Sequence, residues 1–259
     1  ACRKSIRRDY FREAGQHVEL YKGVDTWFQR VNRYAGQRKI SVQHYIISSG
    51  LKEIIEGNMI AKEFKRIYAS SYLYSADGVA EWPAQSVNYT NKTQFIFRIA
   101  KGKFEEYDES VNDSVSKSEL YIPYENIVYI GDSTTDIPCM RLVKDKGGHS
   151  IGVYDPIRNQ RRKVYQLFND GRIDFYAPAD YSSKAPLSQY IKKIIDKISN
   201  QERIKAEQEI LRTHARAYAR YSSLQKLANI ASPNLSNKKR QQFLSSVQYF
   251  KEQIEGNVD

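Results

Sequence analysis

The stretch that most constrains the fold is N-I-V-Y-I-G-D-S-T-T-D-I-P-C-M, residues 126–140. Residues 127–130 are apolar and mostly β-branched, which is typical of a buried strand. Gly131 ends this run, and the carboxylates of Asp132 and Asp136 follow. Open α/β sheets bind ligands at the carboxyl ends of their strands. We therefore expect both carboxylates at a ligand-binding edge of a sheet.

Two interpretations of these carboxylates fit the spacing. Neighbouring carboxylates repel each other, and a divalent cation between them would remove the repulsion. Mg²⁺ commonly takes one or two protein carboxylates, so Asp132 and Asp136 are candidate ligands. In the alternative, the loop is a surface turn in which Asp132 caps the following helix.

The rest of the first 180 residues alternates strand and helix patterns. A strand–loop–helix–strand order predicts a parallel sheet with helices on both faces, the doubly wound α/β class. Asp77-Gly78 lies between two β-prone runs and indicates a hairpin. Residues 4–37 have a helical pattern with a break at Gly23. The other expected elements are strands over 41–50, 149–156 and 173–181, and helices over 93–101, 140–148 and 158–169.

From Leu187 the sequence is almost wholly helical. The apolar spacing predicts one helix over 187–198, a second over 201–230 that Pro233 ends, and a third over 236–254. The predicted domains are a helical segment over 1–40, as part of a cap or lead-in to the core, a core over 41–197, and a helical carboxyl-terminal extension over 198–259.

Composition excludes some classes of protein. No apolar run reaches 18 residues, so no membrane-spanning helix is expected. Cys2 and Cys139 are too few for a disulfide framework or a zinc site, and this favours a reducing, cytoplasmic setting. The net charge of +11 is spread along the chain. Without a recognition motif, nucleic-acid binding by the basic tail is an alternative that ranks below packing or oligomerisation through its helices.

Two further places carry candidate ligand-binding residues. Ser48 and Ser49 end an apolar run just before a short helix, where hydroxyl and backbone N–H groups suit an anion; an ordinary serine N-cap is the alternative. Lys92 precedes the helix over 93–101, where the helix dipole disfavours a cation. That lysine needs a phosphate or carboxylate partner, unless it is simply solvated.

Ser48, Lys92 and the Gly131–Asp136 loop together resemble the haloacid dehalogenase-like (HAD) hydrolase superfamily. An apolar strand ending in Ser48 is similar to the second motif of that family. Lys92 resembles the third motif, with Lys101 as a competing match. The G-D-x-x-x-D pattern over 131–136 resembles the fourth, and the likeness extends over about residues 15–182.

The resemblance implies a Rossmann-like core and a Mg²⁺-dependent phosphohydrolase that acts on a small phosphomonoester through an aspartyl-phosphate. It implies that Asp132, with or without Asp136, holds Mg²⁺ directly or through water. Ser48 and the Ser49 N–H would bind phosphate. Lys92 would bridge the phosphate and the nucleophile.

The chain departs from the family at its first motif, because no D-x-D occurs in it. Asp9 and Asp25 have neither the spacing nor the apolar lead-in. In the family, the first strand lies between the strand ending at Ser48 and the strand ending at Asp132. We therefore expect a gap with two unpaired edges, a nucleophile motif upstream of Ala1, and no activity from this chain alone. The alternative is an inactive relative that binds a phosphorylated ligand or acts in assembly.

Overall fold

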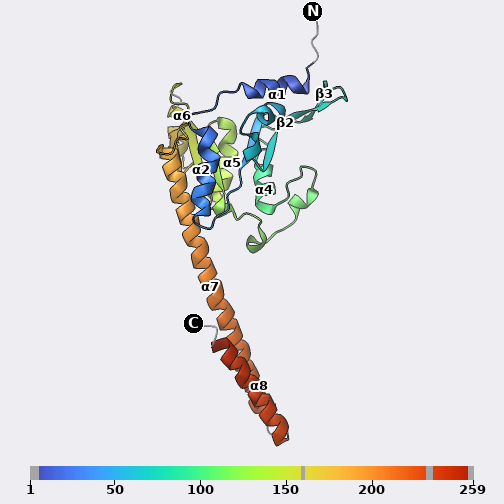
Figure 1. The fold of residues 1–259 in the computed structure, drawn as a ribbon, viewed down its shortest axis with the longest axis vertical. Helices are drawn as coiled ribbons and strands as arrows, with labels where there is room; N and C mark the ends of the chain where they lie inside the picture. The colour runs from blue at the N-terminus through green and yellow to red at the C-terminus, as the bar shows by residue number, and fades with distance from the viewer. Residues whose placement is uncertain (1–5, 159–160, 232–235, 256–259) are drawn as a thin grey trace, which may run out of the picture. The chain divides into compact units, whose positions relative to one another are not determined.

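The structure, a computed structural model, describes residues 6–158, 161–231 and 236–255. The chain divides into two compact units, Ala1–Asp196 and Lys197–Asp259. The first unit is a mixed α/β fold with parallel sheet segments and helices, and the second is helical (Figure 1). The predicted α/β class and the helical carboxyl-terminal part are therefore present.

The first sheet contains β1 (Tyr45–Leu51), β2 (Arg66–Tyr74) and β3 (Ala80–Gln85). β1 pairs with β2 in parallel, and β2 pairs with β3 in antiparallel fashion. The predicted hairpin joins β2 and β3, and Gly78 adopts a φ of 77° in its turn, a conformation that glycine reaches without strain.

The second sheet contains β4 (Val128–Gly131), β5 (His149–Tyr154) and β6 (Phe175–Pro178), all parallel. α5 (Ile137–Asp145) connects β4 to β5, and α6 (Arg161–Asn169) connects β5 to β6. This confirms the predicted strand–helix–strand order. Every residue of β5 is buried, which is typical of a central parallel strand. α5 begins three residues earlier than the expected helix over 140–148, because Pro138 is tolerated in a first helical turn.

The described strands form two sheets and not one. β1 pairs only with β2 and β4 pairs only with β5, among the strands that the structure describes. A gap between the strands ending near Ser48 and Asp132 was expected from the sequence, and the two sheets separate at that place.

Four α-helices complete the first unit up to residue 102. They are α1 (Arg8–Gln16), α2 (Val24–Gly36), α3 (Lys52–Gly57) and α4 (Thr93–Lys101). Figure 1 shows α1 beside the end of the β2–β3 hairpin. α4 has the predicted bounds, and the break at Gly23 separates α1 from α2. The polar segment that follows α4 contains short 3₁₀ helices over 109–112, 117–119 and 124–126.

Two glycines allow α1 and α3 to approach closely. A Cβ atom at Gly15 would lie 2.0 Å from the Ile54 carbonyl oxygen, and one at Gly57 would lie 2.0 Å from the Arg12 carbonyl oxygen. Both distances are far below van der Waals contact. The helices can therefore pack at this separation only while both positions lack a side chain.

Gly15→Ala should lower the free energy of unfolding by about 1–3 kcal/mol, because the added methyl group must push α1 away from α3. Hydrogen exchange at the α1 amides should become faster in the same variant. Gly36→Ala is the matched control, since nothing lies within 4 Å of its Cβ position; it should be neutral or stabilising. Equal stability of the two variants would contradict this interpretation.

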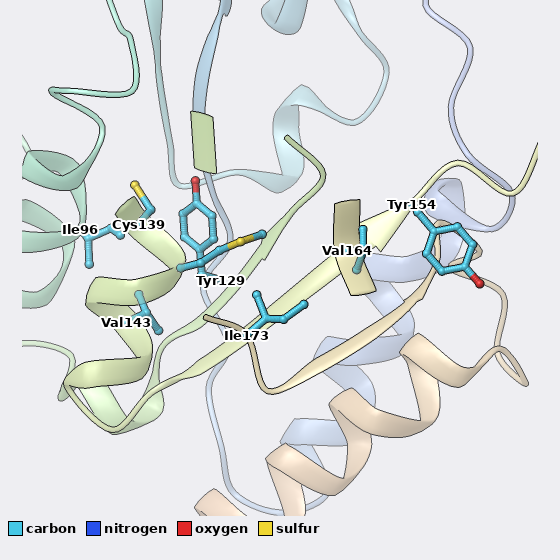
Figure 2. Packing of buried hydrophobic residues seen from close by; sticks show 8 residues of the cluster. Ile96, Tyr129, Cys139, Val143, Tyr154, Val164 and Ile173 are labelled. Atoms are coloured by element: carbon cyan, nitrogen blue, oxygen red, sulfur yellow. The ribbon is translucent and has the colours of Figure 1, made fainter. Parts of the chain in front are cut away.

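Two clusters of buried side chains form the core of the first unit. One joins α4, β4 and α5 through Ile96, Tyr129, Cys139 and Val143, and Figure 2 shows the Tyr129 ring with these neighbours. The other lies between β2 and α4, where Tyr68 stacks on Phe95 at 4.6 Å between ring centroids. α4 therefore packs against strands of both sheets.

The second unit continues α7, a helix of 46 residues from Pro186 to Ala231, and adds α8 (Asn237–Glu255). The prediction of separate helices over 187–198 and 201–230 was wrong, because Ser199 and Asn200 are weak helix formers that do not end a helix without a proline or glycine. The predicted third helix is confirmed as α8. Pro233 lies outside the described residues. Across the described part, no helix is both long and apolar enough to cross a membrane.

Candidate functional site

A groove in the first unit runs along β1 and β4, with a cavity volume of about 720 Å³. At the carboxyl ends of these two strands it gathers the polar residues that the sequence analysis selected. Those residues are Ser48, Ser49, Lys92, Asp132 and Asp136. Residues from three parts of the sequence, up to 88 positions apart, therefore line one region of the groove, at the sheet edge where parallel strands bind ligands.

Lys92 and Asp136 form a buried ion pair in this groove. The Nζ atom of Lys92 lies 2.8 Å from Oδ1 of Asp136, and both side chains are less than one-tenth exposed. Lys92 also donates to the Thr135 hydroxyl at 3.4 Å. A lysine just before α4 was expected to need an anionic partner, unless it was solvated. That partner is the carboxylate of Asp136.

Asp136 is held by three further hydrogen bonds. The Tyr129 hydroxyl donates to Oδ1 at 2.8 Å, while the Ser133 hydroxyl and backbone N–H donate to Oδ2 at 2.9 and 3.2 Å. Burial alone would raise the pKa of Asp136, but the hydrogen bonds and charge of Lys92, with those of Tyr129 and Ser133, lower it below its usual range. Asp136 is therefore an ionised carboxylate whose two oxygens already have donors.

Asp132 is the carboxylate of this loop that stays open to the groove. Its side chain is exposed to solvent. Because it lines the groove, protein atoms still surround part of it. Partial desolvation, and then repulsion from the Asp136 carboxylate, raise the pKa of Asp132. No capping hydrogen bond from Asp132 is present at α5. Ser133 and Asp136 form the capping box of this loop, so the alternative in which Asp132 caps the helix is not what the structure has.

Ser48, Ser49 and Gly50 form the other side of the groove at the end of β1. The Gly50 N–H donates to the Ser48 hydroxyl oxygen at 3.0 Å, and the pairing of β1 with β2 shifts register between Ser48 and Leu51. The resulting bend leaves Ser49 and Gly50 exposed in the groove. The Ser48 hydroxyl oxygen thus accepts a hydrogen bond within this bend, and Ser48 lines the groove.

The described residues do not form a complete metal site. They contain no group of three or more His, Cys, Asp and Glu side chains placed to hold an ion. The Asp136 carboxylate is paired with the Lys92 ammonium. Asp132 fits the role of a Mg²⁺ ligand by itself, because it is an open oxygen donor whose raised pKa a nearby cation would relieve.

The competing lysine, Lys101, and the histidine of this region, His44, have other contacts. Lys101 does not line the groove; its Nζ donates to the Val111 and Asp113 carbonyl oxygens, both at 2.6 Å. His44 packs its ring against Phe28 at 4.9 Å, and burial lowers its pKa to about 4. It is thus a neutral packing residue. Of the two candidate lysines, Lys92 is the one that lines the groove.

The sequence analysis missed the residues that fix the loop. Tyr129, Ser133 and Thr135 were treated as strand and loop residues, yet they hold Asp136 and contact Lys92. A tyrosine in a buried strand was a usable signal, since its hydroxyl requires a partner. The residues of α2 that line the groove, including Trp27 and Phe28, gave no such signal.

Comparison with known proteins adds little to this description. No protein-family model matches the chain. A protein of Borreliella burgdorferi (strain B31), called "Uncharacterized protein", is 27% identical over 194 residues. The match covers 68% of this chain and 67% of that relative. The similarity extends over most of both chains, and the name of the relative states no activity.

The groove combines hydroxyl groups, a buried ion pair and an exposed carboxylate. Ser48, Ser49 and the exposed Asp132 all line it. The buried Lys92–Asp136 pair lines the same groove, and four hydrogen bonds hold the Asp136 carboxylate in place. Such a fixed polar arrangement at an apolar groove is typical of a binding or active site.

Proposed function

We propose that this chain supplies the phosphate-binding and metal-binding part of a Mg²⁺-dependent phosphohydrolase of the HAD type, which acts on a small phosphomonoester. The observation that carries the proposal is the meeting of Ser48, Lys92 and Asp132 at one end of one groove. These are the residues at which the sequence resembles the second, third and fourth motifs of that family.

In this proposal the Ser48 hydroxyl and the Ser49 N–H donate hydrogen bonds to phosphate oxygens. The Lys92 ammonium adds positive charge beside them, and Asp136 holds it in place from the side away from the substrate. Asp132 would hold Mg²⁺, which when bound neutralises phosphate charge. The aspartate nucleophile of an aspartyl-phosphate route is not among these 259 residues. We place the reaction in the cytoplasm, in keeping with two cysteines and no disulfide framework.

The proposal is tested by calorimetric titration of the 259-residue chain with inorganic phosphate, with and without Mg²⁺. We expect Mg²⁺ to increase phosphate affinity at least tenfold, and Asp132→Asn to remove that increase while leaving Mg²⁺-free binding in place. Ser48→Ala should weaken phosphate binding in both conditions by about 1 kcal/mol or more, the contribution of a hydrogen bond to a charged group.

Asp113→Asn is the matched control, since Asp113 is exposed and lies outside the groove. It should leave both titrations unchanged. Phosphate binding that ignores Mg²⁺, or that responds equally to Asp113→Asn and Asp132→Asn, would contradict the proposed site.

The second candidate is a catalytically inactive module that binds a phosphorylated ligand, with nucleic-acid contact through the basic helices as a variant of it. The absence of D-x-D from the chain favours it. Both candidates predict phosphate binding. They differ in turnover of a phosphomonoester once an aspartate nucleophile is supplied, which only the phosphohydrolase gives.

A further inference from the structure

Three aromatic side chains lie together on the outer surface of α6 and β6. They are Tyr165, Phe168 and Tyr176, and each is 36–44% exposed. The ring centroid of Tyr176 lies 4.9 Å from that of Tyr165 and 5.3 Å from that of Phe168. A single exposed aromatic residue is common, whereas a contiguous exposed group marks an interaction site. We call these three residues the aromatic surface.

The helical spacing of α6 explains why two of these rings face outward. Val164 and Leu167 pack on the core of the first unit, and Figure 2 shows Val164 in that cluster. Arg161, Tyr165 and Phe168 are spaced at i, i+4 and i+7, so they share a neighbouring stripe of the same helix. This outer stripe therefore combines one cation with two rings.

β6 contributes the third ring from the rim of the second sheet. Successive side chains of a strand point to opposite faces. Phe175 stacks on Tyr190 of α7, with 4.0 Å between ring centroids, and Tyr176 contacts α6 on the other face. Among the strands that the structure describes, β6 pairs only with β5. The aromatic surface therefore lies where the sheet ends and solvent begins.

Cations surround the amino end of the same helix. The four basic residues between positions 156 and 169 are Arg158, Arg161, Arg162 and Lys163. No Asp or Glu occurs in that stretch. Arg158 pairs with Asp155 at 3.5 Å, and Asp170, directly after α6, pairs with Arg172 at 3.8 Å. The other three cations are exposed and form no ion pair within the described part of the chain. Three uncompensated positive charges thus lie on the helix that carries the rings.

The partner that fits this surface has flat rings and a chain of negative charges. Aromatic side chains stack on nucleobases, and arginine and lysine neutralise phosphates. Acidic peptides have the charge but not a series of flat rings. In a duplex the bases stack on one another, whereas a single strand offers them to a protein. The combination therefore favours a single-stranded nucleic acid.

An anionic membrane surface fits less well. A helix that lies in a membrane interface turns a continuous apolar face toward the lipid. The aliphatic residues of α6, Val164 and Leu167, pack inward on the core instead. Ile157 is the one large aliphatic residue that is exposed among the described residues of this stretch, and a single side chain supplies little insertion.

We propose that the aromatic surface and the three unpaired cations beside it bind single-stranded nucleic acid. Bases stack on the three rings, and Arg161, Arg162 and Lys163 bind the phosphates. α6 has nine residues, about 14 Å at 1.5 Å per residue, which matches about four nucleotides at about 3.4 Å each. This surface is not part of the groove lining, so the proposal does not depend on the phosphohydrolase function.

The test is fluorescence anisotropy with the 259-residue chain and end-labelled strands of eight thymidines or eight uridines. Both strands should bind, because both carry bases and phosphates, and a duplex of the same length should bind at least tenfold more weakly. Each phosphate contact adds about 0.7 to the salt dependence for a single strand. Three contacts therefore predict an affinity that falls about 20-fold between 50 and 200 mM salt.

Ring and charge substitutions should have different effects. Tyr165→Leu with Phe168→Leu keeps apolar side chains but removes the flat rings, so it should weaken binding about tenfold or more and leave the salt dependence unchanged. Arg161→Gln with Arg162→Gln should reduce the fall between 50 and 200 mM salt to about threefold. Tyr165→Phe keeps a ring and should bind like the natural chain. Circular dichroism checks that each variant is folded.

Controls outside the surface show whether binding belongs to it. Tyr107→Leu removes an aromatic residue that is 82% exposed elsewhere, and it should change nothing. Lys238→Ala, Lys239→Ala and Arg240→Ala together remove three exposed charges from the first turn of α8, and they should leave the affinity within about twofold. Photocrosslinking of the natural chain to a strand with 5-iodouracil should label residues 161–176. That readout needs no variant to fold.

Binding that ignores the ring substitutions, or a duplex that binds as tightly as a single strand, would overturn the proposal. So would crosslinks outside 161–176, or a loss in the α8 control equal to that of the arginine variant. Displacement of the strand by an equal concentration of oligoglutamate would assign the surface to an acidic protein instead. Binding to vesicles of one-third phosphatidylserine and two-thirds phosphatidylcholine, without binding of either strand, would assign it to a membrane.

Discussion

Replacing Asp136 with alanine should lower the free energy of unfolding of the first unit by about 3–5 kcal/mol. The variant leaves the Lys92 ammonium buried, with 5% of its side chain exposed, and removes its carboxylate partner. An uncompensated buried charge is among the most destabilising changes in a protein interior. The loss includes the Tyr129 and Ser133 donors, whose acceptor disappears with the same side chain.

Urea unfolding followed by tryptophan fluorescence measures this loss in the first unit alone. Trp27 and Trp82, the two tryptophans of the chain, both lie in that unit. Asp132→Ala is the matched control, because Asp132 has the same side chain four residues away and is exposed. It should change stability by about 0.5 kcal/mol or less. A loss below about 1 kcal/mol for Asp136→Ala would show that the buried pair is not formed in solution.

Lys92→Met should destabilise the same unit by about 3 kcal/mol at pH 7, and the loss should shrink as the solution is acidified. In the natural chain the pKa of Asp136 is lowered. The stabilisation from its ionised form is therefore present above the unfolded-state pKa of about 3.9 and disappears as pH falls through the folded-state value.

Without Lys92, burial becomes the main influence on Asp136, and burial raises a carboxyl pKa. The folded variant is then penalised most when Asp136 must be ionised, at neutral pH, and protonation relieves the penalty as pH falls toward about 4. The difference between the natural chain and Lys92→Met should narrow by at least about 1.4 kcal/mol for each unit by which that pKa rises.

Lys193→Met is the control for this pH series, since Lys193 is exposed and should give an offset that does not change with pH. The double variant Lys92→Met with Asp136→Ala should lose less than the sum of the two single variants, because neither charge is left alone. A pH-independent loss for Lys92→Met would contradict the lowered pKa of Asp136.

The sequence was most informative where a local pattern decides the structure. The apolar run before Gly131, the Asp77-Gly78 turn and the helix of 93–101 all have signals within a few residues, and each element is present. The end of α4 at Gly102, which adopts a φ of 71°, is one such local signal.

The parts that local patterns do not decide were harder to predict. Lys92 and Asp136 are 44 positions apart, and nothing in either local sequence states that they meet. Sequence reasoning treated Lys92 as a phosphate ligand and Asp136 as a metal ligand. The structure instead pairs their charges with each other, while their roles toward a ligand stay predictions. The continuity of α7 was also missed. Weak helix formers in its sequence were interpreted as the end of one helix, although they lie inside a single helix.

β1 and β4 each have one edge that pairs with no strand in the described part of the chain. These two edges affect how the protein behaves in solution. Unpaired strand edges can form backbone hydrogen bonds with any other exposed strand. The apolar lining of the groove adds exposed hydrophobic surface, which favours association. We expect the chain to associate with itself at high concentration.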